Sequence, residues 1–131
     1  LMNALSLQFT VPVGGDDIGA VTGDVALRLA RGDERWTPVG GAAVESPQAQ
    51  EVIYVDDADI VLCRRWNWRQ GDETKITEAT RDVILNIDCL PPVTRDEAQR
   101  LVLHLSQQVW AFCGGDVSYH LIDRRNPSVV I

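Results

Sequence analysis

Cationic side chains are scarce in this chain. It has 12 lysine and arginine residues, of which Lys75 is the only lysine, against 19 acidic residues, and its net charge is −7. Because affinity for nucleic acids comes mainly from neutralising phosphates, this balance argues against general binding to nucleic acid. The charge is uneven, however: residues 64–81 carry +2 and the remainder −9. That basic segment suits contact with one anionic group or a short piece of RNA.

Cysteine is also sparse. The three cysteines are Cys63, Cys89 and Cys113, an odd number at spacings that match no zinc motif, even with His104 and His120. The sequence therefore predicts reduced thiols without a disulfide, and neither a metal nor another cofactor.

Long apolar runs and a signal-peptide pattern are missing too. No run of about eighteen apolar residues occurs, so the sequence predicts no membrane span, and it favours a cytoplasmic location. The 131 residues suffice for one domain with a core. Because the chain begins within a helical pattern that has no cap, we expect residues 1–131 to be a single domain at the C-terminal part of a longer chain. The oligomeric state stays open.

Two of the four tryptophans lie in the basic segment. If residues 60–68 form one strand, alternation places Trp66 and Trp68 on the same face, where they would make a stacking platform. Alternatively, both rings cap the edge of a core and the neighbouring arginines extend over it.

The remaining patterns predict an α+β fold, a mostly antiparallel sheet with one principal helix. Residues 1–9 form the end of a helix, and Asp16-Asp17 opens a short helical turn. Strands are expected over residues 24–30, 35–39, 51–55, 60–68, 81–90 and 115–123, with the first two joined as a hairpin at Gly32-Asp33.

The principal helix is predicted over residues 94–113. Thr94 and Glu97 form a capping box, and Gly114 supplies the stop. One apolar stripe at helical spacing is formed by Ala98, Leu101, Val102, Leu105, Val109 and Phe112.

A resemblance to a known family is carried by Arg28–Glu34, Thr37–Gly41, Asp59–Leu62, Thr80–Asn86 and Leu90–Pro92. These segments resemble the B3/B4 domain of the phenylalanyl-tRNA synthetase β-subunit. The stretch Arg64-Arg65-Trp66-Asn67-Trp68-Arg69 is more similar to stand-alone B3/B4-domain proteins. This resemblance implies a tRNA-associated editing domain, which hydrolyses the ester of a mischarged amino acid. In this family, a glutamate at a position near Asn86 recognises the hydroxyl of tyrosine. In this chain the resemblance implies that Asp88, two residues after Asn86, takes the place of that glutamate.

An aminoacyl ester is already activated, so its hydrolysis needs mainly a positioned water and a held substrate. The catalytic candidates are Asp88, Asn86 and Thr80. The candidates for binding the aminoacylated 3′ end of tRNA are Arg65, Trp66, Asn67, Trp68, Arg69, Lys75 and Thr77. The arginines and Lys75 would hold phosphates, and a tryptophan would stack on the terminal base.

Each candidate also has an ordinary structural interpretation. Asp88 could pair with an arginine, Thr77 and Thr80 could cap turns, and Lys75 could be solvated. The alternative function is a non-catalytic binding module for a free amino acid, RNA or a protein partner. Whether the chain is an enzyme, a possible aminoacyl-tRNA deacylase, is left open by the sequence, which contains no Gly-x-Ser-x-Gly motif.

Overall fold

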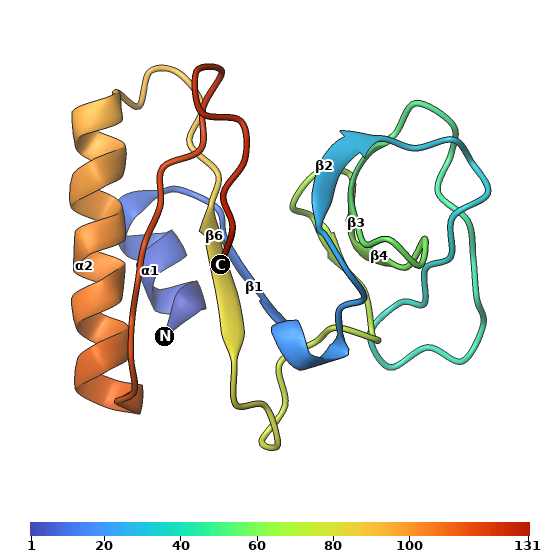
Figure 1. The fold of residues 1–131 in the computed structure, drawn as a ribbon, viewed down its shortest axis with the longest axis horizontal. Coiled ribbons are helices and arrows are strands. Elements are labelled where there is room, and N and C mark those ends of the chain that lie inside the picture. The colour runs from blue at the N-terminus through green and yellow to red at the C-terminus, as the bar shows by residue number, and fades with distance from the viewer. The chain divides into compact units, whose positions relative to one another are not determined.

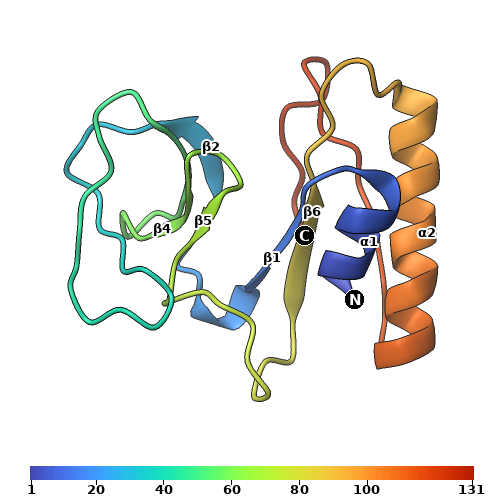
Figure 2. The ribbon, with the colours of Figure 1, turned by 180° about the vertical axis from the view of Figure 1, so that it is seen from behind.

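The computed structural model describes residues 1–131 as two compact units. The first unit contains Leu1–Val13 and Ile87–Ile131, and the second contains Gly14–Asn86. Figures 1 and 2 show the chain from opposite sides. Each unit is described by itself below.

Two helices form the first unit, α1 (Met2–Phe9) and α2 (Arg95–Cys113). Both agree with the sequence-based prediction. The capping box is present, because the Thr94 N–H donates to Glu97 Oε2 at 2.7 Å and the Glu97 N–H donates to Thr94 Oγ1 at 3.3 Å. These bonds satisfy backbone donors that a helix otherwise leaves free at its start. Gly114, with a positive φ, ends α2.

The helices lie side by side in both views (Figures 1 and 2), and Leu5, Val11 and Leu105 are buried. The predicted apolar stripe of α2 is only partly correct. Leu105 is buried, but Phe112 is 76% exposed. The reason is length, because the eight residues of α1 cannot cover the 19 residues of α2.

The predicted strand over residues 115–123 is wrong. This segment has no strand structure and runs back along α2 (Figure 1), where Asp123 forms an ion pair with Arg95. Alternating apolar residues fix which way side chains point, but a strand also needs a neighbouring strand to pair its backbone.

Most strands lie in the second unit, and they confirm the α+β class. An antiparallel sheet has the order β2-β3-β4-β5, formed by Ala26–Leu29, Val52–Val55, Val61–Arg64 and Arg69–Gln70. A two-stranded sheet pairs β1 (Val13–Asp17) with β6 (Val83–Ile87). The short helix η1 (Ile18–Ala20) begins where Asp17 Oδ1 accepts the Gly19 N–H at 2.9 Å, as the sequence predicted.

The predicted hairpin between residues 24–30 and 35–39 is wrong. Strand β2 pairs with β3 instead, and Trp36 makes only an isolated bridge to Glu45. The turn at residues 31–34, after β2, is stabilised by Glu34. The buried Glu34 carboxylate accepts the N–H groups of Arg31 and Gly32 at 2.9 and 3.0 Å. Arg28 also donates to this carboxylate at 2.5 Å. The segment after β2 therefore folds around the buried Glu34 carboxylate.

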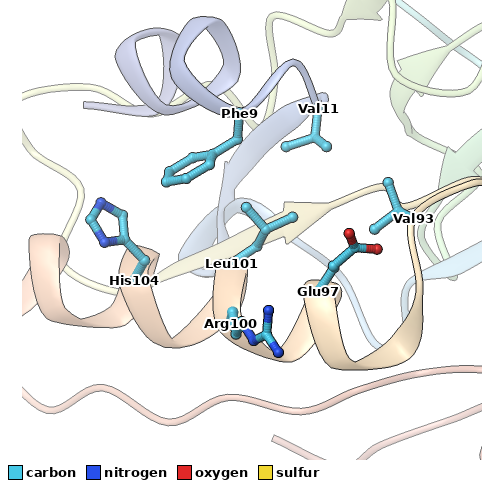
Figure 3. Close-up of a pocket in the computed structure, with 7 residues that line it drawn as sticks. All are labelled: Phe9, Val11, Val93, Glu97, Arg100, Leu101 and His104. Atoms are coloured by element: carbon cyan, nitrogen blue, oxygen red, sulfur yellow. The ribbon is translucent and has the colours of Figure 1, made fainter.

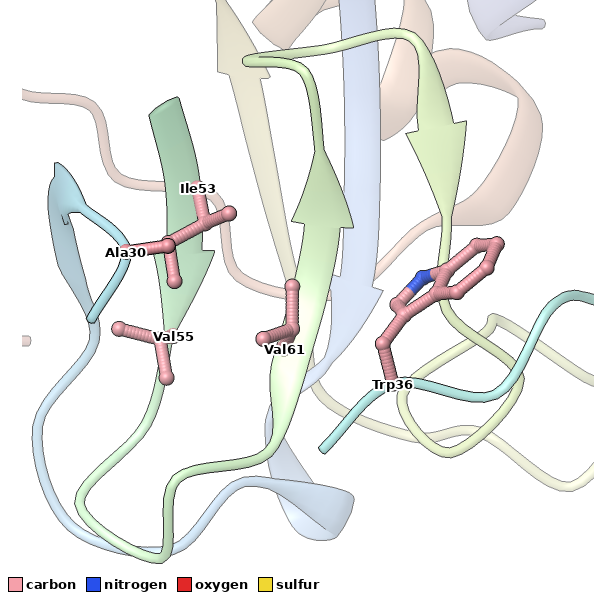
Figure 4. Close-up of a cluster of buried hydrophobic side chains, with 5 residues drawn as sticks. All are labelled: Ala30, Trp36, Ile53, Val55 and Val61. Atoms are coloured by element: carbon pink, nitrogen blue, oxygen red, sulfur yellow. The ribbon is translucent and has the colours of Figure 1, made fainter. Parts of the chain in front are cut away.

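The core of the second unit is a cluster of buried side chains, Ala30, Trp36, Ile53, Val55 and Val61 (Figure 4). They come from β3, β4 and the segment that follows β2.

All three cysteines are free thiols. None of the helices combines the length and the apolar character that a membrane-spanning helix needs. No group of three or more metal-ligating side chains is positioned to hold a metal ion.

Candidate functional site

The basic segment ends β4 and makes a tight turn at residues 65–68, before β5. Arg65 and Trp66 have φ angles of 50° and 66°, in the left-handed region. The predicted continuous strand over residues 60–68 is therefore wrong beyond Arg64. Trp66 and Trp68 do not share a strand face, and the stacking platform of two rings does not form. The sequence hid this turn because it has no glycine at the two left-handed positions.

The turn presents one tryptophan to solvent. Trp68 is 68% exposed, and the guanidinium of Arg65 lies over its ring, 5.0 Å from the ring centroid. Trp66 is half-buried, and its indole Nε1 is buried without a hydrogen-bond partner. Two consecutive left-handed residues that are not glycine store backbone strain, a feature that clusters at binding sites.

The two arginines that flank the turn, Arg64 and Arg69, pack against the core of the second unit. The buried Arg64 donates to both carboxylate oxygens of Glu51 at 2.9 Å. The Arg64 and Arg69 guanidiniums lie 4.9 and 4.6 Å from the centroid of the buried Trp36 ring. Arg69, a predicted phosphate ligand, is therefore placed against Trp36.

Three other predicted residues have partners within the second unit. Lys75 pairs with Asp72 at 2.6 Å. The Thr80 hydroxyl donates to Asp17 Oδ2 at 2.6 Å and accepts the Thr77 N–H at 2.9 Å. These contacts stabilise the loop after β5, as the ordinary interpretation of the threonines anticipates.

A small polar cavity of about 30 Å³ lies beside the turn in the second unit. It brings together two of the predicted residues, Asn67 and Asn86. No tryptophan lines it; the lining residues are Gly14, Asp16, Tyr54, Cys63, Asn67, Gln70 and Asn86.

Asp16 in β1 is the one acidic group in this lining. Its side chain is buried, and Oδ1 accepts hydrogen bonds from Gln70 Nε2 at 2.6 Å and Thr74 Oγ1 at 2.7 Å. Burial raises the pKa of the Asp16 carboxyl above its ordinary value, although the bonds from Thr74 and Gln70 oppose this shift.

Asp88 follows β6 and belongs to the first unit. Its backbone N–H donates to the Pro12 carbonyl at 3.2 Å. Burial and the charge of Asp88 together raise the pKa of the neighbouring Cys89 thiol.

Sequence reasoning missed Asp16, Gln70 and Thr74. Asp16 was read only as the start of a helical turn, because Gly14-Gly15-Asp16-Asp17 consists of residue types that are depleted in strands. Nothing in its local pattern separates a buried aspartate from a solvated one.

The first unit has a larger hollow of about 420 Å³ beside α1 and α2 (Figure 3). Leu101 points from α2 toward Phe9 and Val11, and His104 meets the Phe9 ring edge-on at 5.1 Å. Glu97, at its rim, is already used in the capping box. None of the predicted site residues lines this hollow; its lining is Phe9, Val11, Val93, Glu97, Arg100, Leu101 and His104.

The comparisons with known proteins decide the family. The family model described as "B3/4 domain" matches residues 1–109. The chain belongs to the B3/4 domain family. This finding confirms the resemblance that the sequence indicated.

One curated protein and one solved structure are similar to this B3/4 domain. The phenylalanine–tRNA ligase β-subunit of Shewanella oneidensis is 27% identical over 105 residues, which cover 79% of this chain and 13% of that protein. The solved N-terminal fragment of the phenylalanyl-tRNA synthetase β-subunit from Pyrococcus horikoshii matches with a TM-score of 0.53 and 15% identity. That match covers 64% of this chain and 31% of the fragment, and it supports the fold alone.

Proposed function

We propose that this B3/4 domain binds the aminoacylated 3′ end of tRNA and hydrolyses the ester of a mischarged amino acid. One observation carries the proposal: a single turn presents the exposed Trp68 with Arg65, while Asn67 of the same turn lines a polar cavity. A base could stack on Trp68, and Arg65 could hold a phosphate next to it. The Shewanella oneidensis relative, a β-subunit of phenylalanine–tRNA ligase, supports the same class of ligand.

The cavity limits what the site could hold. Its volume of about 30 Å³ admits one small polar group, so the amino-acid side chain would stay outside. Asn67 and Asn86 supply amide groups for orienting the aminoacyl end. The ester is activated, so a held substrate and a water from solvent are the minimum that hydrolysis needs.

The alternative, a binding module without catalysis, is favoured by a different observation. Thr80 was predicted to be catalytic and Thr77 to bind the substrate, but both hydroxyls are used within the protein: Thr77 Oγ1 accepts the Ala79 N–H, and the Thr80 hydroxyl donates to Asp17 Oδ2. Under this alternative the same turn and cavity bind the aminoacyl end without turnover.

Trp68→Ala is the substitution that tests the binding surface. It should weaken binding of aminoacyl-tRNA by about 1–3 kcal/mol, because it removes one base-stacking contact. The melting temperature should stay unchanged, since Trp68 is 68% exposed. Fluorescence anisotropy with labelled aminoacyl-tRNA at one fixed salt concentration measures the change.

Trp110→Ala is the matched control. Trp110 lies on α2 and is 67% exposed, so it has the same chemistry as Trp68 and nearly the same exposure. Its loss should leave the affinity for tRNA unchanged. Equal effects of the two substitutions would mean that neither tryptophan belongs to a specific site.

A further inference from the structure

Asp16 is a buried carboxyl group without a cation beside it. The residue is only 7% exposed, and no lysine, arginine or histidine forms an ion pair with it. Both of its hydrogen bonds, from Gln70 and Thr74, reach the same oxygen, Oδ1. A buried carboxylate without a positive partner is costly, and Asp16 lines the cavity, so a cation that enters the cavity would stabilise the ionised carboxylate.

A second buried aspartate, Asp56, accepts hydrogen bonds at both of its carboxylate oxygens. Asp56 is 4% exposed, and its Oδ1 accepts the N–H groups of Ala58 and Ile60 at 3.0 and 2.9 Å. Its Oδ2 accepts the Thr22 N–H at 3.0 Å. Asp56 therefore uses both oxygens to hold the chain, whereas Asp16 uses one.

The cavity beside Asp16 fits an ammonium group. An ammonium has three donors and no acceptor, and the lining of the cavity includes the Asp16 carboxylate as an acceptor. The absence of a side chain at Gly14 keeps this space open, because a Cβ there would lie 2.9 Å from Asn86 Oδ1.

We propose that the cavity is an ammonium subsite in which Asp16 binds the free α-ammonium group of an aminoacyl compound. The choice of an aminoacyl compound rests on the proposed function, whereas the ammonium itself follows from the carboxylate and the cavity. N-acylated compounds are excluded, because acylation removes the positive charge and adds a group that about 30 Å³ cannot hold. The subsite thus separates an aminoacyl end from an N-blocked one.

The test uses three small probes, glycinamide, N-acetylglycinamide and glycolamide, and the full 131-residue chain labelled with ¹³C at the aspartate carboxyls. Near neutral pH, glycinamide should shift the Asp16 resonance saturably, with an affinity at least about tenfold higher than either neutral probe, since a bond to a charged donor is lost with each. The Asp56 resonance is the internal control and should not move.

Asp16→Asn assigns the resonance and separates binding from folding. The asparagine Oδ1 can still accept from Gln70 and Thr74, so this variant should fold normally and lose the response to glycinamide. If no probe moves the Asp16 signal, or if all three move it equally, the cavity holds only a structural water and the inference is wrong.

The ammonium subsite and the proposed function can be refuted independently of each other. A specific glycinamide response without any binding or hydrolysis of charged tRNA would keep the subsite and overturn the proposed function. Hydrolysis of charged tRNA that is insensitive to N-acetylation, with no glycinamide response, would keep the function and overturn the subsite.

Discussion

Arg64→Ala should destabilise the protein by about 3–5 kcal/mol, because it leaves a buried carboxylate without its cation. The Arg64 and Glu51 side chains are only 7% and 10% exposed, and the guanidinium donates to both oxygens of Glu51. Arg64 also lies over the Trp36 ring, so truncation removes packing as well as charge. Urea unfolding followed by tryptophan fluorescence at neutral pH measures the change.

Arg65→Ala is the control at the next position. Arg65 is exposed, and its guanidinium contacts only the exposed Trp68 ring among the aromatic side chains. Its loss should change the free energy of unfolding by less than about 0.5 kcal/mol, as is usual for surface substitutions. Similar losses from both substitutions would contradict the division of the basic segment into a structural arginine and a ligand-facing one.

Acid should destabilise the protein between pH 4.5 and about 2 through Glu34. Burial alone would raise the pKa of this carboxyl, but hydrogen bonds from the Arg31 N–H, the Arg28 guanidinium and the Gly32 N–H lower it from 4.5 to about 2. The folded protein thus favours the ionised form, so this stabilisation is complete above pH 4.5 and is lost as the pH falls toward 2. Its expected size is about 1–3 kcal/mol.

Glu34→Gln should make the protein less stable at neutral pH and should flatten its loss of stability on acidification. Asp33→Asn is the control, because the Asp33 side chain is 73% exposed and pairs with Arg31 at the surface. Urea unfolding at a series of pH values from 7 to 2 compares the three proteins. Parallel pH profiles for the wild type and Glu34→Gln would show that another group controls the acid transition.

The principal helix could be predicted from sequence because its signals are local and agree with one another. Thr94, Glu97 and Gly114 act within one turn of the helix ends, so no distant partner decides the outcome. The final strand failed for the opposite reason, because strand formation depends on a partner that the local sequence does not name.

The candidate site was only partly predictable. Asn67 and Asn86 were predicted and line one cavity, but Asp16, 51 positions before Asn67, reaches it through the fold. The turn at residues 65–68 could not be predicted because Arg65 and Trp66 occupy left-handed positions where glycine is the usual signal. The surrounding tertiary structure holds them there.

Release of amino acid from charged tRNA tests the central claim most directly. Under single-turnover conditions, the chain is mixed with a panel of correctly charged and mischarged tRNAs, and the first-order rate of release is compared with that in buffer. The account predicts faster release from at least one mischarged tRNA, reduced by Trp68→Ala and unchanged by Trp110→Ala. Release at the buffer rate from every tRNA, by wild type and variants alike, would contradict it.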